Sequence, residues 1–203
     1  MSSDIMSISR LRMATDGRGI TTLVAFYGCP LNCKYCINRQ CHKNVPRGDY
    51  TAEELVKVLK KDELYYLMTD GGVTFGGGEP LLQSEFIHIL CNMMNKRWRR
   101  VVETSLYVPW ENIEILLNDI DYWYIDIKDL RPEGYKKYTG KDNQIVIVNL
   151  IHLLSTIDSR KVCIRIPYIP KFNTYEDVKA EKEYILEKIC STVDVECFDY
   201  IRC

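Results

Sequence analysis

The feature that most constrains this chain is the loop YGCPLNCKYCIN, residues 27–38, which places Cys29, Cys33 and Cys36 within eight positions. An odd set of thiols cannot pair off completely as disulfides, and a tetrahedral zinc site needs a fourth ligand, usually from a second paired motif. Iron–sulfur clusters are held by cysteine thiolates, four for a fully ligated cubane. Three thiolates leave one iron open for chemistry, so the spacing favours a catalytic [4Fe–4S] cluster over a zinc site.

Composition limits the classes of protein to which the chain can belong. Its 203 residues are 46% hydrophobic and 27% charged, as expected for one soluble globular domain, and we predict a single domain over residues 1–203. The net charge of −1 argues against a general nucleic-acid partner. We see no signal peptide and no apolar run near the ~20 residues of a membrane helix. Nine cysteines without an export signal indicate the reducing cytoplasm, where clustered thiols serve metal binding or catalysis.

Strand patterns and helix patterns alternate along the chain. Six strands are predicted, over 21–27, 72–75, 99–104, 122–128, 161–167 and 193–201. Helices are predicted over 51–68, where Thr51 and Glu54 form a capping box, and over 84–96, 111–119, 143–157 and 175–190. This alternation predicts an α/β fold with parallel strands and with active groups at their carboxyl ends. Because six strands are fewer than the eight of a closed barrel, we expect an open, partial barrel.

Several motifs together resemble one family. CPLNCKYCIN is similar to the signature of radical S-adenosylmethionine (SAM) enzymes, and the surrounding residues resemble the pyruvate formate-lyase activating enzyme group, which activates glycyl-radical enzymes. The motifs are, in order, DGRGITTLVAFYGC, VTFGGGEPLLQ, VVETS, YIDIKD, YTG and IRIPYIP, between residues 14 and 172. The resemblance implies an open partial (β/α)6 barrel of the radical SAM type.

The resemblance also implies a set of site residues. Cys29, Cys33 and Cys36 would hold the [4Fe–4S] cluster, and SAM would chelate the fourth iron through its amino and carboxylate groups. The family uses the GGGEP loop to hold the SAM amino group. A monovalent cation would lie beside the SAM carboxylate, near the acids that end the third and fourth strands. The matching SAM-binding positions here are Tyr35, Gly77, Gly78, Glu79, Glu103, Thr104, Asp126 and Lys128.

Each of these motifs also has a structural interpretation, which the sequence leaves open. GGGEP follows a strand, and its glycines equally suit a simple strand-to-helix turn. Asp126 and Lys128 are two residues apart on one strand face and equally suit a structural ion pair. Arg165 either faces a carboxylate or is a solvated strand-edge residue.

The activity that the resemblance implies is radical formation. The reduced cluster cleaves SAM to methionine and a 5′-deoxyadenosyl radical, which abstracts a hydrogen atom from a substrate. In the activases that substrate is a glycine of a partner glycyl-radical enzyme, and Asp16 would contact the backbone of its glycine loop, with Lys128 and Arg165 as further catalytic residues. A flavodoxin or ferredoxin-type protein would supply the electron.

Other functions stay open beside this one. A radical SAM enzyme that modifies a peptide, for example by epimerisation, could use Cys197 or Cys203 to return a hydrogen atom. A small-molecule substrate is a further alternative. A non-catalytic iron–sulfur electron carrier would need four protein ligands and would have no use for GGGEP.

The chain departs from the family pattern in three places. Gly76 stands where the family commonly has serine. Cys41 is the only cysteine between Cys36 and Gly76. The ferredoxin-like insert of some activases, which carries further cysteines, is therefore missing. The family's C-terminal segment, with a histidine near the SAM ribose, has no counterpart before the chain ends at CFDYIRC.

Overall fold

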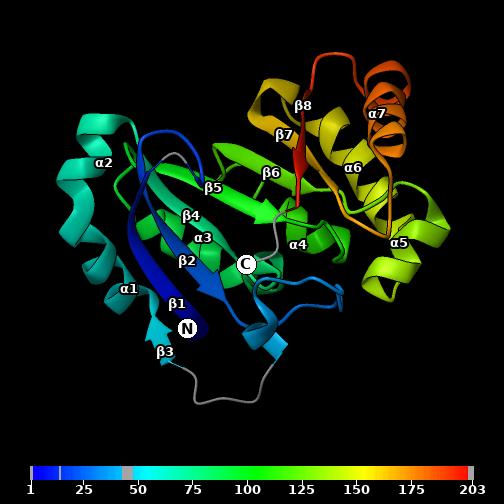
Figure 1. Cartoon of the computed structure of the whole chain (residues 1–203). Coiled ribbons are helices and arrows are strands. Elements are labelled where there is room, and N and C mark those ends of the chain that lie inside the picture. Colours follow the sequence, from blue (N-terminus) through cyan, green and yellow to red (C-terminus); the bar gives the residue numbers. More distant parts are fainter. Residues whose placement is uncertain (1, 14, 43–47, 201–203) are drawn as a thin grey trace. The chain divides into compact units, whose positions relative to one another are not determined.

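A computed structural model describes residues 2–13, 15–42 and 48–200 of the chain (Figure 1). The chain groups into two compact parts. The first comprises Met1–Cys29, Asn38–Glu103 and Trp110–Tyr122, and the second comprises Pro30–Ile37, Thr104–Pro109 and Trp123–Cys203. No helix among the described residues is long and apolar enough to cross a membrane.

Parallel and antiparallel strands meet in the first part, in the order β3-β1-β2-β4-β5. β2, β4 and β5 are parallel neighbours and are the first three predicted strands, whereas β1 pairs antiparallel with both β2 and β3. The pattern analysis did not predict β1 or β3. The strands are β1 Ser2–Met13, β2 Ile20–Phe26, β3 Gly48–Thr51, β4 Gly72–Gly77 and β5 Arg99–Thr104.

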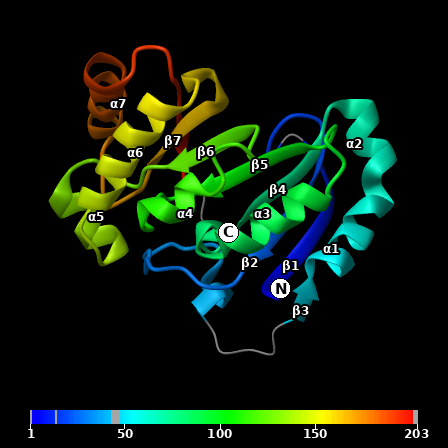
Figure 2. The same ribbon diagram turned by 180° about the vertical axis from the view of Figure 1, so that it is seen from behind.

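The helices of the first part are shorter than the sequence predicts. They are α1 Ala52–Leu59, α2 Glu63–Thr69, α3 Ser84–Met93 and α4 Trp110–Glu114. The capping box of Thr51 and Glu54 is confirmed at the start of α1, which packs on α3 (Figure 2). The single helix predicted over 51–68 is wrong, because a 3₁₀ turn at Lys60–Asp62 interrupts it. The buried Asp62 in that turn pairs with Arg10 at 2.6 Å, a contact that a continuous helix pattern does not reveal.

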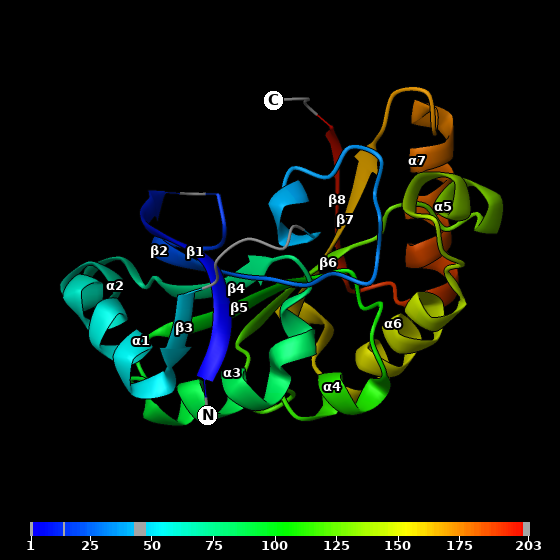
Figure 3. The same cartoon turned by 90° about the horizontal axis from the view of Figure 1, so that it is seen from below.

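Three parallel strands form the second part, in the order β6-β7-β8. They are β6 Tyr122–Asp126, β7 Val162–Tyr168 and β8 Asp194–Asp199, with helices α5 Pro132–Thr139, α6 Gln144–Thr156 and α7 Tyr175–Tyr184. α7 continues as a π-helical turn and packs on β7 and β8 (Figure 3). α5 was not predicted. β6 ends two residues earlier than predicted, so Lys128 follows the strand.

All six predicted parallel strands are therefore present. The strands β4 and β7 are almost wholly buried along their length, as is usual for parallel strands covered on both faces. Because the strands themselves are buried, we expect the functional residues in the loops that follow the carboxyl ends of the strands.

Candidate active site

The three clustered cysteines lie in the loop that follows β2. Cys29 closes a segment of the first part, whereas Cys33 and Cys36 belong to the second, where the amide of Cys36 donates to the Cys33 carbonyl oxygen at 3.2 Å. All three are half-buried, and within the described part of the chain none of them forms a disulfide. Within the described ranges, no three His, Cys, Asp or Glu side chains are grouped closely enough to hold a metal ion. The three-cysteine ligand set therefore stays a prediction.

Charge and burial act in opposite directions on Cys33. Burial raises the pKa of the Cys33 thiol, and the nearby Cys36 and Asp126 raise it further, whereas the positive charge of Lys128 lowers it. Because burial outweighs Lys128, the thiol stays protonated at neutral pH, and a metal ion would have to displace that proton to bind. Cys91 differs, because it is fully buried and its pKa is raised to about 12.

The GGGEP loop at the end of β4 brings backbone against backbone. The amide of Gly78 donates to the Phe26 carbonyl oxygen at 2.9 Å, and the amide of Glu79 donates to the Gly28 carbonyl oxygen at 2.7 Å. A Cβ on Gly78 would lie 2.1 Å from that Gly28 oxygen, and Gly77 has a φ of +97°. The glycines are thus required for the loop itself, and they leave no side chain over its backbone.

Glu79 lies inside this loop with its carboxylate turned inward. The residue is 1% exposed, and one oxygen accepts from the Leu81 amide at 3.3 Å, so that Glu79 caps the short 3₁₀ helix Pro80–Gln83. Asn38, which sequence reasoning did not select, donates to the Gly77 carbonyl oxygen at 2.7 Å. Asn38 is the last residue of the YGCPLNCKYCIN loop, and this position was the only signal that pointed to it.

Three charged residues form a network where β6 and β7 end. Lys128 Nζ lies 3.2 Å from Asp126 Oδ2, and Arg165 Nε lies 2.8 Å from Asp126 Oδ1, with all three side chains between 17% and 27% exposed. Burial raises the pKa of the Asp126 carboxyl, but Lys128 and Arg165 outweigh burial and lower it. Burial likewise opposes the charged form of Lys128, whose pKa is raised by Asp126 and Cys33. Arg165 faces a carboxylate and also lies over the Tyr124 ring at 4.7 Å, so it is not a solvated edge residue.

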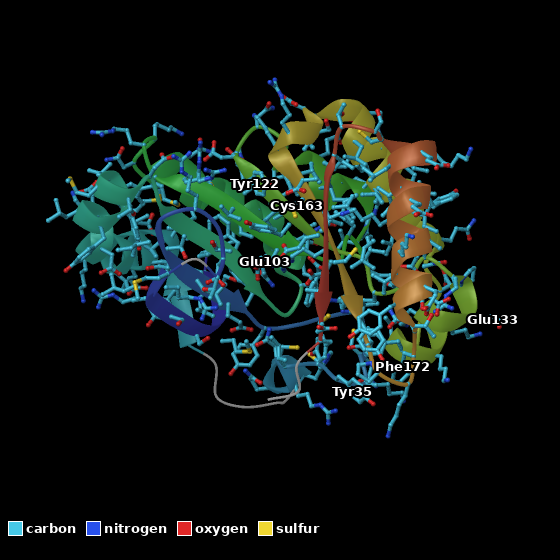
Figure 4. All side chains as sticks on the ribbon, turned by 45° about the horizontal axis from the view of Figure 1, so that its top comes forward. Tyr35, Glu103, Tyr122, Glu133, Cys163 and Phe172 are labelled. Atoms are coloured by element: carbon cyan, nitrogen blue, oxygen red, sulfur yellow. The ribbon has the colours of Figure 1, made fainter. Side chains whose placement is uncertain are left out.

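The remaining predicted residues have contacts of their own. Glu103 lies half-buried near the end of β5 (Figure 4), and the buried Thr104 accepts from the Leu106 amide at 3.0 Å. Asp16 is buried, forms an ion pair with Arg12, and accepts at its backbone oxygen from Thr74 at 2.7 Å. The roles assigned to these residues stay predictions, and Cys203 lies outside the described residues.

Sequence reasoning missed an aromatic cluster around Tyr35. The Tyr35 ring centroid lies 6.2 Å from that of Tyr138 and 5.5 Å from that of Phe172, and Figure 4 shows Tyr35 and Phe172 side by side. Tyr138 was visible in the YTG motif, but Phe172 carried no signal. The contacts bring the residue before Cys36 against α5 and the loop after β7.

Comparison with known proteins decides the family. Residues 23–184 match the model of the radical SAM superfamily. The chain belongs to this superfamily. It is 36% identical to the (2S)-3-sulfopropanediol dehydratase activating enzyme of Klebsiella oxytoca, over 86% of this chain and 74% of that protein. It is 34% identical to the pyruvate formate-lyase-activating enzyme of Clostridium pasteurianum, over 91% and 77%. The predicted membership of the activating-enzyme group is confirmed, and the chain is an enzyme of the radical SAM type.

A solved structure confirms the fold. Streptococcus suis SuiB bound to S-adenosylmethionine matches with a TM-score of 0.68 and 17% identity over 88% of this chain. This chain spans 40% of that protein's length. The predicted α/β fold, an open partial barrel of the radical SAM type, is therefore correct. The family implies a [4Fe–4S] cluster and SAM, and three half-buried cysteine thiols in one loop have the donor chemistry that such a cluster requires.

Proposed function

We propose that this chain is the activating enzyme of a glycyl-radical enzyme, and that it generates a glycine-centred radical on that partner. The observation that carries the proposal is the identity of 36% and 34% to two activating enzymes over most of this chain. When bound, the cluster supplies the electron that cleaves SAM to methionine and a 5′-deoxyadenosyl radical, which abstracts hydrogen. The protein supplies binding, orientation and protection from solvent.

Cys29, Cys33 and Cys36 are the proposed iron ligands. They differ from Cys41, Cys91 and Cys163, which are buried, because partly exposed thiols can reach a ligand without unfolding their surroundings. The positive charge of Lys128 near Cys33 favours the thiolate that iron requires.

The proposed SAM contacts are of two kinds, those of the GGGEP loop and those of charged or polar side chains elsewhere. Gly77, Gly78 and the Glu79 carboxylate would receive the amino group of SAM, as hydrogen-bond acceptors near a cation. Lys128 and Tyr35 would contact the rest of the ligand. The acids Glu103 and Asp126, with Thr104, would hold a monovalent cation beside the SAM carboxylate, because oxygen ligands suit hard cations.

The proposed substrate contacts come from Asp16 and Arg165. Each already has an ionic partner, Arg12 for Asp16 and Asp126 for Arg165. A carboxylate has about four acceptor sites, so Asp16 paired with Arg12 can accept further hydrogen bonds from the backbone of a glycine loop. A flavodoxin or ferredoxin-type protein is the proposed electron donor, and the cytoplasm the proposed location.

The test combines iron, SAM and the partner enzyme. The anaerobically reconstituted protein should bind about four irons per chain, as a cubane requires, and should cleave SAM when reduced. With the glycyl-radical enzyme encoded beside it, the mixture should give a stable glycyl doublet in electron paramagnetic resonance. Cys33→Ala should lose the iron and the signal. Cys91 is a buried thiol with a pKa raised to about 12, so Cys91→Ala should keep both.

Two outcomes would reject parts of the proposal. Equal iron content in Cys33→Ala and the wild type would reject the cluster ligand set. SAM cleavage that a peptide or a small molecule stimulates, without any glycyl signal from the partner, would reject the proposed substrate and favour the alternative radical SAM activities.

A further inference from the structure

Tyr200, directly after β8, returns the chain to the cysteine loop within the second part. Its amide donates to the Tyr168 carbonyl oxygen at 2.9 Å, which ties its backbone to the end of β7. Its hydroxyl donates to the carbonyl oxygen of Tyr35, and the two rings stack with centroids 6.4 Å apart and planes 27° apart. Tyr200 therefore contacts Tyr35 through both its ring and its hydroxyl, across 165 positions of sequence.

The hydroxyl contact falls on the peptide unit that joins Tyr35 to Cys36. A peptide unit is planar, so its carbonyl oxygen and its N–H move together. The oxygen of this unit accepts from Tyr200, and its N–H, that of Cys36, donates to the Cys33 carbonyl oxygen at 3.2 Å. With both ends bonded, the unit fixes the orientation of the backbone between the two cysteines.

Two further hydrogen bonds hold the cysteine loop against α5. The amide of Asn32 donates to the Thr139 carbonyl oxygen at 2.9 Å, and the amide of Lys34 donates to the Tyr138 carbonyl oxygen at 3.0 Å. These two bonds hold the loop on α5 on either side of Cys33. Neither bond involves the carbonyl oxygen of Tyr35, to which the Tyr200 hydroxyl donates.

We infer that Tyr200 is a positioning residue for the cysteine loop: its hydroxyl holds the Tyr35–Cys36 peptide so that Cys33 and Cys36 present their thiols at the spacing that a metal cluster needs. The role in cluster binding rests on the proposed function, whereas the role in ordering the loop does not. Tyr200 acts through the backbone of Tyr35 and touches neither reacting atoms nor iron.

The surroundings of the hydroxyl keep it a hydrogen-bond donor. Burial raises the pKa of Tyr200, and Cys36 and Cys33 raise it further, although Lys128 and a hydrogen bond with the Tyr138 hydroxyl lower it. A tyrosine that stays protonated at neutral pH retains the one proton that it can donate to a carbonyl oxygen.

The experiment compares Tyr200→Phe with Tyr175→Phe. The first variant keeps the ring and removes only the donor to Tyr35. The second removes the hydroxyl that donates to Asp199 at 2.7 Å, while its ring still stacks on Tyr168 at 4.0 Å. Both variants lose one hydroxyl from the second part, so Tyr175→Phe controls for any general loss of stability. Thermal melting of each variant checks that the fold is intact.

The first measurement is amide hydrogen exchange of residues 30–37 in metal-free protein. Loss of one hydrogen bond should speed exchange of the Cys36 amide about fivefold in Tyr200→Phe, with no change in Tyr175→Phe. The second measurement is the rate at which the reconstituted protein loses iron to a chelator, which should rise in Tyr200→Phe alone. Cys36 exchange equal to that of the wild type in Tyr200→Phe would overturn the inference.

The two measurements separate this inference from the proposed function. If the wild-type protein binds no iron, the proposed function fails, and the exchange comparison still decides whether Tyr200 orders the loop. If the wild type binds iron and cleaves SAM but both variants behave alike, the inference about Tyr200 fails and the proposed function stands.

Discussion

The ends of β4 and β6 each hold a polar loop in place, and they do so by opposite means. After β4, the loop is fixed by backbone hydrogen bonds from Gly78 and Glu79 to Phe26 and Gly28, at distances that exclude a side chain. After β6, the loop is fixed by charge, with Asp126 between Lys128 and Arg165.

The difference matters for the conditions to which each loop responds. Close packing of neutral backbone depends on shape, and a single added methyl group can break it. Buried ion pairs depend on the presence of both partners and on their protonation, so they respond to charge changes and to pH. We therefore expect an added side chain to destabilise the glycine loop by steric overlap. We expect the charged loop to be destabilised when a charge loses its ionic partner.

Gly78→Ala is the substitution with the largest expected effect. The new Cβ would lie 2.1 Å from the Gly28 carbonyl oxygen, a backbone atom that cannot turn away. Relief requires the loop to shift and to give up the bond between Glu79 and Gly28. We expect a loss of more than about 3 kcal/mol in the free energy of unfolding, measured by urea denaturation. A loss below about 1 kcal/mol would show that the loop adapts, and that shape does not fix it.

Asp126→Asn breaks the charged loop. The variant leaves Lys128 and Arg165, whose side chains are 20% and 17% exposed, without the carboxylate that compensates both. Removing one partner of a buried pair is costly, and we expect a loss of about 2–3 kcal/mol in the same denaturation measurement. Asp158→Asn is the matched control, because Asp158 pairs with Arg160 at an exposed position. Equal losses in the two variants would show that burial of the β6 network adds nothing.

Glu181→Gln tests whether pH acts on the charged loop. Glu181, 5% exposed on α7, accepts from the Leu130 amide at 2.9 Å, in the loop that follows β6. Burial, together with Asp129, raises its pKa from 4.5 to about 8, although Arg131 lowers it. Between these two values the folded protein holds a proton that the unfolded chain has lost, so stability falls as pH rises through this window.

Glutamine has no such proton, so the variant should lack this part of the pH dependence. Relative to the wild type, Glu181→Gln should gain about 2 kcal/mol in free energy of unfolding between pH 6 and pH 8. Denaturation curves at both pH values provide the measurement. A difference between variant and wild type that does not change with pH would mean that Glu181 ionises normally in the fold. The difference between Gly78→Ala and the wild type should not change with pH, because Gly78→Ala retains Glu181, and this keeps the two loops distinguishable.

The sequence predicted what depends on nearby residues. The six parallel strands, the capping box of Thr51 and Glu54, the GGGEP turn and the pairing of Asp126 with Lys128 all arise within short segments. Periodicity, caps and glycines record such features directly, because the residues that make the contact are close in sequence.

What the sequence did not predict depends on partners far along the chain. Arg165 reaches Asp126 across 39 positions, so only the pairing of β6 with β7 brings them together. Glu181 stands in the charged segment EDVKAEKEY, which is typical of an exposed helix, yet tertiary packing buries it. The antiparallel strand β1 lacked a regular alternation, since bulges shift its register against β2.

The smallest change in the free energy of unfolding is expected for a substitution at Gly76, two residues before Gly78. Gly76→Ser introduces the residue that the family commonly carries, and its Cβ would lie 3.2 Å from Leu23 Cδ1 and 3.3 Å from Glu103 Oε2. Both atoms end flexible side chains, which can move by a few tenths of an ångström where the Gly28 carbonyl cannot. The φ of Gly76 is not in the left-handed region, so a side chain adds no backbone strain. We expect a change of less than about 0.5 kcal/mol in the free energy of unfolding, from the same urea curves. A loss as large as that of Gly78→Ala would mean that the whole strand end excludes side chains; a small one would confine the steric requirement to the turn that carries Glu79.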